Sequence, residues 1–205
     1  LLVLPEYFPI ISASEQERWQ LRESYGQGPL QDWLAATAKR HGVWLAGGSI
    51  PLVASAADKL CNACLVFDPA GDCVGRYDKI HLFNYDNGRE HYDESAYIEA
   101  GDRPVALDLP FGRVALSICY DLRFPELYRA LAPVDLILVP AAFTDTTGQA
   151  HWEILLRARA IENHAYVVAA GQQGEASGHP MWGHSMVVDP WGAVLGECEK
   201  IGRAS

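Results

Sequence analysis

The sequence has little positive charge and no long hydrophobic run. Its 205 residues include 16 Lys and Arg against 26 Asp and Glu, which gives a formal net charge of −10. A chain this acidic repels phosphate backbones and anionic lipid, so we expect neither nucleic acid nor a membrane surface as a partner. The apolar run from Val134 is interrupted by Asp135 and Pro140, well short of the ~20 residues that a membrane-spanning helix needs. The composition therefore predicts a soluble globular protein.

The chain is also poor in cysteine, with five such residues. An odd number spread over this length is not typical of a disulfide framework, so we expect reduced thiols and a cytoplasmic location. Cys61 and Cys64 form one C-x-x-C, but no second pair completes a zinc site. Both lie in the apolar run LCNACLVF, where cysteine behaves as a small hydrophobe, so we expect them buried on opposite faces of a strand. A redox or zinc protein would instead hold the two sulfurs together at a surface.

The chain lacks an initiator methionine as well. Residues 1–4 read LLVL, without the basic region or the cleavage site of a secretory signal. Four apolar residues before Pro5 and Glu6 indicate a buried strand that the sequence enters midway. We therefore expect one domain over residues 1–205 that lacks flanking sequence.

Predicted strands and helices alternate along the chain. Apolar residues from Leu30 to His41 recur at helical spacing up to Gly42, and further helices are expected over 125–132 and 152–163. Strands are expected at 1–4, 43–46, 60–68, 73–77, 105–107, 114–118, 136–139, 167–170, 185–188 and 193–197, with turns at 69–72 and 189–192. Residues 82–104 are polar and predict irregular structure. This alternation predicts an α/β sandwich of mixed sheets.

Cys119 differs from the other cysteines in its position. It follows the predicted buried strand 114–118 and precedes a turn that enters a helix at Pro125. A residue placed there lies at the rim of a sheet, where N–H groups of a helix end stabilise a thiolate, the nucleophilic form of cysteine. Cys119 is therefore a candidate nucleophile, and the alternative is an inert buried cysteine.

A nucleophilic cysteine needs a base. Of the seven histidines, His81 and His184 are candidates, with a structural or surface role as the alternative, and none has metal-ligand spacing. Glu6 ends the first strand at a similar rim, where partial desolvation makes a carboxylate a better proton acceptor; the alternative is a capping role. Lys79 lies between a strand and an apolar segment. A buried ammonium implies a carboxylate partner, whereas a solvated strand end is the alternative.

Three segments carry a resemblance to one known family. VLPE at 3–6, YDKIHLF at 77–83 and SICYDLRFPELYR at 117–129 resemble the glutamate, lysine and cysteine motifs of the nitrilase superfamily of carbon–nitrogen hydrolases, in the family's order. AHWEILLRARAIEN at 150–163 and GHSMVVDPWG at 183–192 are similar to its Nit-type amidase branch. Members of that branch act on the ω-amide of small acids or on deaminated glutathione.

The resemblance implies a fold and an assembly. Family members are four-layer αββα sandwiches that pair through a helix and the C-terminal region, which implies a homodimer or a higher homo-oligomer. It also implies that the strand and helix preceding residue 1, and a segment following residue 205, are missing from the sequence.

The resemblance further implies a mechanism that uses no metal and no organic cofactor. Cys119 would attack an amide carbonyl to form a thioester, and Glu6 would act as general base and acid. Lys79 and the backbone N–H of Tyr120 would stabilise the oxyanion. The family's second glutamate, which positions the lysine, maps best onto Glu94. Acidic alternatives nearby are Glu90, Asp93 and Glu99.

The resemblance also implies that the substrate is a small amide. Tyr120 and Asp121 follow the nucleophile, which is the amidase pattern. True nitrilases carry Trp and Glu at these two positions. Phe143, Thr144 and His151 are expected to line the pocket together with residues from 82–94, while Asp121 and Arg123 brace the nucleophile turn. The segment 157–162 favours a deaminated glutathione amidase, with an omega-amidase acting on α-ketoglutaramate-type substrates as the alternative.

An alternative of another class is a non-catalytic fragment or binding module that retains the fold. The two classes differ in geometry. An enzyme requires the side chains of Glu6, Lys79 and Cys119 to converge on one point.

Overall fold

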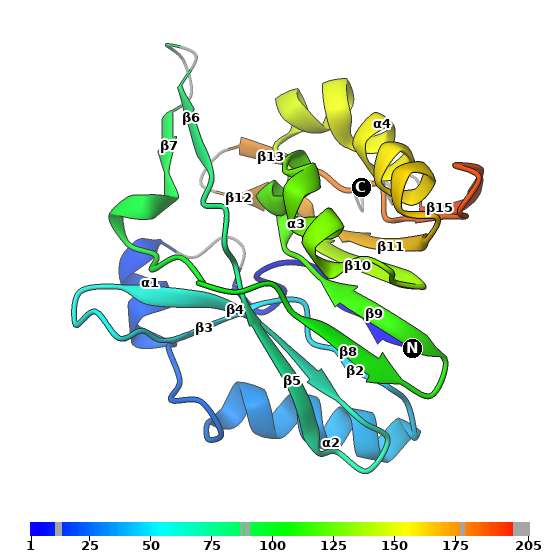
Figure 1. Ribbon diagram of the computed structural model, residues 1–205. Helices are drawn as coiled ribbons and strands as arrows, with labels where there is room; N and C mark the ends of the chain where they lie inside the picture. The colour runs from blue at the N-terminus through cyan, green and yellow to red at the C-terminus, as the bar shows by residue number, and fades with distance from the viewer. Residues whose placement is uncertain (11–13, 87, 89–90, 177–178, 199–205) are drawn as a thin grey trace, which may run out of the picture.

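Two β-sheets packed face to face organise the chain, as Figure 1 shows for the computed structural model. The structure describes residues 1–10, 14–86, 88, 91–176 and 179–198. The first sheet contains β1 (Leu2–Val3), β2 (Leu45–Ala46), β3 (Ile50–Val53), β4 (Leu60–Phe67) and β5 (Cys73–Asp78). The second has the strand order β15-β14-β11-β10-β9-β8. These are β8 (Ala106–Leu109), β9 (Gly112–Leu116), β10 (Leu136–Ala141), β11 (Tyr166–Gly171), β14 (Met186–Val188) and β15 (Val194–Glu197).

Both sheets are mixed, as predicted. In the first sheet β1 pairs with β2 in parallel, whereas β4 pairs antiparallel with β2, β3 and β5. In the second, β9, β10 and β11 are parallel and the strands outside them are antiparallel. The parallel core brings the carboxyl ends of β9 and β10 to one edge of the sheet, where Cys119 and Ala142 lie just beyond them.

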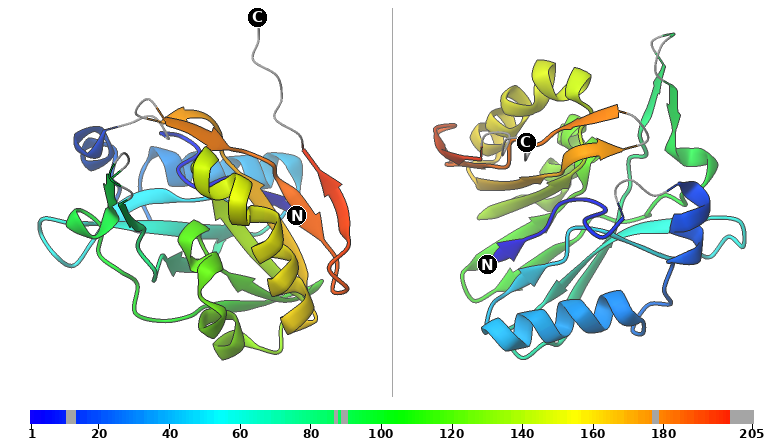
Figure 2. Two further views of the ribbon diagram at one scale, coloured as in Figure 1. Left: turned by 90° about the horizontal axis from the view of Figure 1, so that it is seen from above. Right: turned by 180° about the vertical axis from the view of Figure 1, so that it is seen from behind.

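Helices cover the outer face of each sheet (Figure 2). α2 (Pro29–His41) lies on the first sheet, and α3 (Pro125–Leu131) and α4 (Asp145–Asn163) lie on the second. α2 ends as predicted at Gly42, whose φ of 61° is the left-handed conformation that stops a helix. α4 begins seven residues before the predicted 152, because Thr144 caps it by accepting a hydrogen bond from the Thr147 amide.

Alternation along β4 divides the hydrophobic core into two layers. Cys61, Ala63 and Leu65 face α2, where Leu34 and Ala38 belong to the same cluster. Cys64 and Val66 face the second sheet and join a larger cluster that includes Val114 and Leu116 of β9 and continues to Trp152 of α4. The order helix, sheet, sheet, helix is the four-layer αββα sandwich that the resemblance implied.

The cysteines of the C-x-x-C pair are both buried, one in each core layer. Burial raises the pKa of Cys61 to about 11 and that of Cys64 to about 12. Since the two side chains point to opposite faces of β4, the redox and zinc interpretation of this pair is wrong. Over the described residues, the structure contains no group of three or more His, Cys, Asp or Glu side chains that could hold a metal ion.

The segment 82–104 contains more structure than its polar sequence predicted. It forms a hairpin of β6 (Asn84–Asp86) and β7 (His91–Asp93), which leads into the 3₁₀ turn η1 (Glu94–Ala96). The remaining elements are the short helix α1 (Glu15–Gln20), the 3₁₀ turn η2 (Cys119–Arg123) and the hairpin β12 (Gln173–Ala176) with β13 (His179–Trp182). In the described part of the chain, no helix has the length and apolarity to cross a membrane.

Candidate active site

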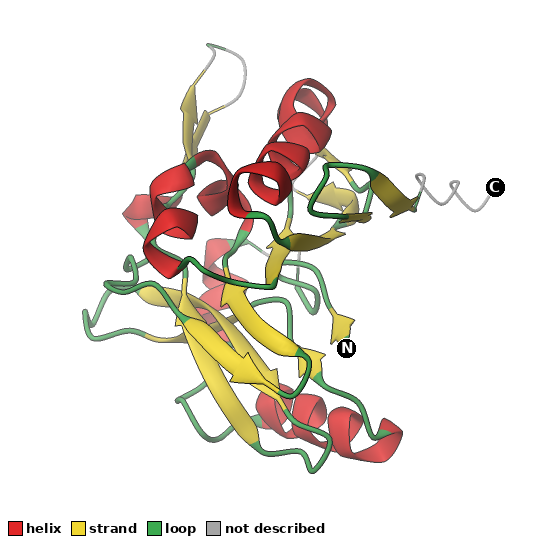
Figure 3. Ribbon diagram, turned by 45° about the vertical axis from the view of Figure 1, so that its right-hand side comes forward, coloured by secondary structure: helices red, strands yellow, loops and turns green. Residues whose placement is uncertain are grey.

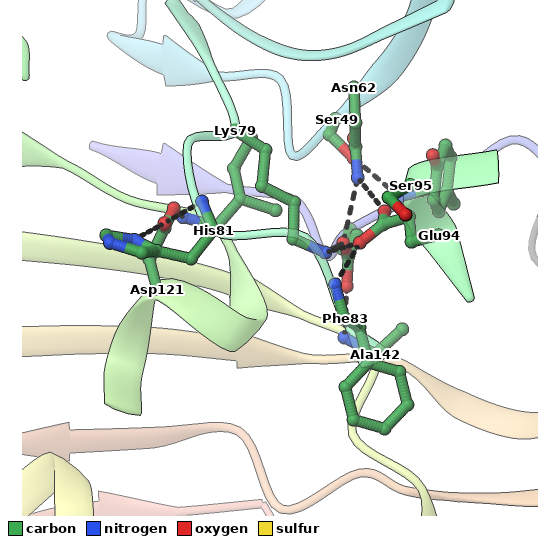
Figure 4. A network of polar contacts seen from close by, with 12 residues as sticks. Ser49, Asn62, Lys79, His81, Phe83, Glu94, Ser95, Asp121 and Ala142 are labelled. Atoms are coloured by element: carbon green, nitrogen blue, oxygen red, sulfur yellow. Dashed lines mark hydrogen bonds and ion pairs between the residues drawn. The ribbon is translucent and has the colours of Figure 1, made fainter. Parts of the chain in front are cut away.

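One ammonium and two carboxylates meet between the sheets. Glu6 lies just beyond β1, Lys79 directly follows β5 and Glu94 opens η1. Lys79 Nζ is 2.9 Å from Glu6 Oε1 and 2.8 Å from Glu94 Oε2, and the three side chains are 2–7% exposed. Figure 4 shows Lys79 reaching Glu94 across this buried space. The capping and solvated-end alternatives for Glu6 and Lys79 are therefore wrong.

Other donors hold both carboxylates in place. Asn62 Nδ2 donates to Glu6 Oε1 at 2.9 Å and to Glu94 Oε1 at 3.3 Å. The Ala142 amide donates to Glu6 Oε2 at 2.9 Å, and the Phe83 amide donates to Glu94 Oε2 at 2.8 Å. Glu6 therefore bridges the two sheets, because Lys79 follows a strand of the first and Ala142 follows a strand of the second.

Glu94 is the second acidic residue of the site, as the motif comparison favoured. Of its alternatives, Asp93 instead caps η1 by accepting from the Ser95 amide, and Glu99 binds Ser55 and the Ala56 amide. The third alternative, Glu90, lies outside the described residues.

These neighbouring carboxylates stabilise the positive charge of Lys79. Burial by itself lowers the pKa of the ammonium, but the carboxylates of Glu6 and Glu94, with a further contribution from Cys119, hold that pKa well above its ordinary value. A fixed positive charge in a buried site stabilises negative charge that develops nearby.

Cys119 lies in the wall of the same cavity. It opens η2 with a φ of 49°, a left-handed conformation that costs a non-glycine residue free energy and is common at functional sites. Burial, followed by the Glu6 carboxylate, raises the pKa of the Cys119 thiol well above its ordinary value, while Lys79 and the Ala142 amide offset part of that rise. In the resting site, burial therefore outweighs the backbone amide that favours the thiolate. The thiol is protonated and needs a base.

A buried carboxylate, Asp121, holds the turn that carries Cys119. It accepts hydrogen bonds from Tyr77 Oη at 2.7 Å, from the Ile118 amide at 2.8 Å and from the His81 amide at 3.0 Å. The His81 ring adds an Nδ1 contact of 2.7 Å and stacks on Phe124. Figure 4 shows Asp121 and His81 side by side, apart from the Lys79 ammonium.

Neither histidine candidate for the base reaches the nucleophile. His81 is occupied with Asp121, and His184 pairs with Glu197 at 2.6 Å. Neither lines the cavity that contains Cys119, whereas Glu6 does. Glu6 is consequently the carboxylate placed to accept the thiol proton.

The cavity has a volume of about 550 Å³ and is lined by Glu6, Lys79, Glu94 and Cys119. Thr144 lines it as expected, and both Phe143 and Thr144 line a small adjoining cavity of about 20 Å³ beside Cys119 and Tyr120. His151 lines neither cavity and instead lies 3.2 Å from Arg123 Nη1. The expectation that His151 lines the pocket is therefore wrong.

A second cavity of about 600 Å³ lies beside β5 and contains none of these groups. Its walls include Tyr25, Cys73 and Arg76, and Arg76 is already paired with Asp78 at 2.9 Å. This cavity contains none of the candidate catalytic side chains despite its size, so the candidate active site is the cavity at Cys119.

Sequence reasoning missed several residues of the site. Asn62 holds both carboxylates from the middle of β4, and Tyr7 and Arg18 line the cavity. The signal for Asn62 was present, since an amide in the otherwise apolar run LCNACLVF must find buried partners. No comparable signal marks Tyr7 or Arg18.

Comparison with known proteins identifies the class to which this fold and site belong. The profile of the carbon-nitrogen hydrolase family matches residues 1–202, so the chain belongs to that family. It is 45% identical over 181 residues to the deaminated glutathione amidase of Yersinia enterocolitica, an alignment that covers 85% of this chain and 63% of that protein.

Two further relatives place it in the Nit-type branch. It is 45% identical over 166 residues to the omega-amidase NIT2 of Homo sapiens, covering 79% of this chain and 59% of the relative. The crystal structure of the C. elegans NitFhit protein superposes with a TM-score of 0.84 at 40% identity, covering 97% of this chain and 50% of that one. The chain thus spans roughly half to two thirds of the length of these proteins.

Proposed function

We propose that this protein hydrolyses the carbon–nitrogen bond of a small carboxylic-acid amide through a thioester on Cys119, and that deaminated glutathione amidase is the activity it resembles most. The observation that carries the proposal is the meeting of Glu6, Lys79, Glu94 and Cys119 in one cavity. This is the convergence that separates an enzyme from a binding module that keeps only the fold.

The first step follows from the protonation states. Glu6 takes the proton from the buried Cys119 thiol, and the sulfur attacks the amide carbonyl carbon. Glu6 Oε1 already accepts from Lys79 and Asn62, whereas Oε2 accepts from one amide of the described residues, that of Ala142. Oε2 is therefore the oxygen with a lone pair available for the proton.

The second step expels ammonia. The tetrahedral oxyanion is stabilised by the Lys79 ammonium and by the backbone N–H of Tyr120, and each such donor contributes about 3–4 kcal/mol. Glu6 returns its proton to the nitrogen, the C–N bond breaks and a thioester remains. Water that has lost its proton to Glu6 then cleaves the thioester to give the carboxylic acid and the free thiol.

Glu94 has a positioning role in this scheme. It holds Lys79 at 2.8 Å, and its second oxygen is fixed by Asn62, so the ammonium stays aimed into the cavity. The segment 157–162 supports the turn that carries Cys119 and does not contact the substrate in this scheme. Arg159 donates to the Leu122 carbonyl at 3.0 Å and pairs with Glu162, which supports the nucleophile turn.

The test is ammonia release from deaminated glutathione, α-ketoglutaramate and simple ω-amides by the full-length protein. Cys119→Ala should abolish release, while Cys73→Ala, an exposed cysteine outside this cavity, should leave it unchanged. Ammonia release that survives Cys119→Ala contradicts the mechanism. The relatives with the two activities are both 45% identical to this chain, so sequence identity does not separate them. A preference for α-ketoglutaramate would favour the omega-amidase alternative.

We also propose self-association through the exposed face of α4. Ile154 and Ile161 lie seven residues apart on that face and are 69% and 50% exposed. Gly192 packs against Ile161, which brings the neighbouring Trp191, 89% exposed, to the same side. Apolar side chains grouped in this way are typical of an interface. Ile161→Glu should lower the molecular mass measured by sedimentation equilibrium, and an unchanged mass would contradict the proposal.

A cytoplasmic location remains part of the proposal. Cys61, Cys64, Cys73, Cys119 and Cys198 are all free thiols, which suits a reducing compartment.

A further inference from the structure

The segment that carries Lys79 is attached to one carboxylate on both sides of the lysine. Tyr77 Oη donates to Asp121 Oδ2 at 2.7 Å, and the His81 amide donates to Asp121 Oδ1 at 3.0 Å. Asp121 is fully buried and belongs to η2, the turn that Cys119 opens. One buried carboxylate therefore joins the lysine segment, at the end of a strand of the first sheet, to the nucleophile turn of the second.

The His81 ring adds two contacts with this turn. Nδ1 lies 2.7 Å from Asp121 Oδ1, and because an ionised carboxylate only accepts hydrogen bonds, this nitrogen carries a hydrogen. The ring also stacks on Phe124, with the ring centres 3.7 Å apart and the planes 8° from parallel. Phe124 ends η2, and its amide donates to the Asp121 carbonyl at 2.9 Å. The ring thus contacts the turn at its middle and at its end.

The two oxyanion donors of the proposed mechanism come from these two joined segments. The Lys79 ammonium is held by Glu6 and Glu94, and Figure 4 shows it pointing away from His81. The other donor, the Tyr120 amide, belongs to η2. Both donors must reach the same oxygen, and a displacement of about 1 Å can cost about 100-fold in rate. Their spacing depends on how firmly the lysine segment is attached to the turn.

We propose that His81 is a positioning residue which, through Asp121, fixes the spacing between the Lys79 ammonium and the Tyr120 amide. The role rests on the amide hydrolysis proposed above. His81 does not line the cavity that contains Cys119, so it acts without touching the substrate. The oxyanion develops only in the transition state, so a loss of spacing weakens the transition state more than the bound amide. The expected effect is therefore on kcat and not on KM.

The experiment compares two substitutions that place an N–H donor differently. The side-chain nitrogen of Asn is as many bonds from the backbone as Nδ1 of His, whereas that of Gln is one bond farther. For the amide that the full-length protein hydrolyses fastest, His81→Gln should lower kcat by ~10- to 100-fold and change KM by less than ~3-fold. His81→Asn should restore kcat to within ~5-fold of the natural protein.

The matched control is His184→Gln. His184 also contacts a carboxylate through Nδ1, that of Glu197 at 2.6 Å, and also stacks on a ring, that of Trp182, but it does not line the cavity. This variant should leave kcat and KM unchanged. Equal losses of kcat in His81→Gln and His81→Asn, or a KM that rises as far as kcat falls, would overturn the inference.

A binding measurement separates this inference from the proposed reaction. Butyraldehyde adds to a thiol with no leaving group: the sulfur–carbon bond forms, the carbonyl π bond opens and the thiol proton passes to the oxygen. Calorimetric titration, with the heat from Cys119→Ala subtracted, measures this addition at Cys119. An affinity that falls ~10-fold or more in His81→Gln supports the positioning role even if no amide is hydrolysed, which would overturn the proposed function alone. An affinity that His81→Gln leaves unchanged would overturn the inference.

Discussion

Removing the positive charge from the buried site should destabilise the protein in a way that depends on pH. In Lys79→Met the side chain stays unbranched and is one atom shorter, but Glu6 and Glu94 lose the ammonium that lies 2.9 Å and 2.8 Å from them. All three groups are buried. Removing one partner of a buried ion pair costs about 3–5 kcal/mol, because the remaining charge is left uncompensated.

This loss is large beside the whole free energy of unfolding, which is about 5–15 kcal/mol for a typical domain. With a urea dependence of about 2 kcal/mol per molar, the unfolding midpoint of Lys79→Met at about pH 8 should fall by about 1.5–2.5 M. Circular dichroism during urea titration measures that midpoint.

The sign of the pH dependence follows from proton uptake. In the folded variant two carboxylates share one buried space, so protonating one of them relieves repulsion that the unfolded chain does not have. The folded variant therefore binds a proton more readily than the unfolded chain, and the deficit should shrink between about pH 8 and about pH 5. In the natural protein, the raised pKa of Lys79 means that the stability from its charge is present at neutral pH and, on the alkaline side, is lost only as the pH rises above the ordinary lysine value of ~10.4.

The control is Lys79→Met combined with Glu94→Gln, which leaves a single carboxylate. It should be more stable than Lys79→Met alone at about pH 8 and should show a weaker pH dependence, because the two substitutions are coupled. An unchanged midpoint for Lys79→Met, or a deficit that is the same at both pH values, would refute the electrostatic reasoning.

Three further predictions test the surroundings of the site. Asp121→Asn should lower the free energy of unfolding, measured by urea titration, by about 1–3 kcal/mol, because one amide oxygen cannot accept from Tyr77 and the Ile118 and His81 amides together. The same variant should lower kcat more than it raises KM. An equal change in both constants would contradict this prediction. Gly48→Ala should reduce ammonia release, since its Cβ would lie 2.0 Å from the Pro5 carbonyl beside Glu6, whereas Gly42→Ala, at a similar φ of 61° but in open space, should not. Burial and Asp121 raise the pKa of Tyr77, so stability should fall as pH rises above about 10, and phenolate absorbance should develop only together with unfolding; phenolate that forms in the folded protein would contradict this.

Local sequence patterns predicted the parts of the fold that local chemistry controls. The turn between β4 and β5 forms because Asp68 Oδ1 accepts from the Ala70 and Asp72 amides, which is a property of the turn residues themselves. β3 was missed because Pro51 interrupts its apolar run. Proline is tolerated there since β3 pairs with β4 on one side only among the described strands.

Tertiary contacts decided what the sequence could not. The first turns of α4 read as polar and contain Gly148, which disfavours a helix. In the structure Gly148 is needed, because a Cβ there would lie 2.2 Å from Trp182, a residue 34 positions away. Contacts at such separations are invisible to patterns read along the chain.

The site, like the fold, was predicted from sequence motifs in part and depends on tertiary contacts for the rest. Ordered motifs identified Glu6, Lys79 and Cys119 as a set, and the structure places them in one cavity. The balance of effects on the Cys119 thiol could not be read from the sequence, because burial outweighs the nearby amide and burial depends on both sheets. Arg18 was missed because it comes from a short helix whose docking beside Tyr97 no sequence pattern describes.

The bridge between Glu6 and the Ala142 amide joins positions 136 residues apart and has a consequence for synthesis on the ribosome. The first half of the chain, up to about residue 100, carries the proposed base Glu6 and Lys79, and the second half carries the proposed nucleophile Cys119. A nascent chain that has emerged only as far as η1 has no thiol at this site, and Cys119 meets its base only when the second sheet docks on the first. The proposed nucleophile and its proposed base therefore come together in the same event that closes the core.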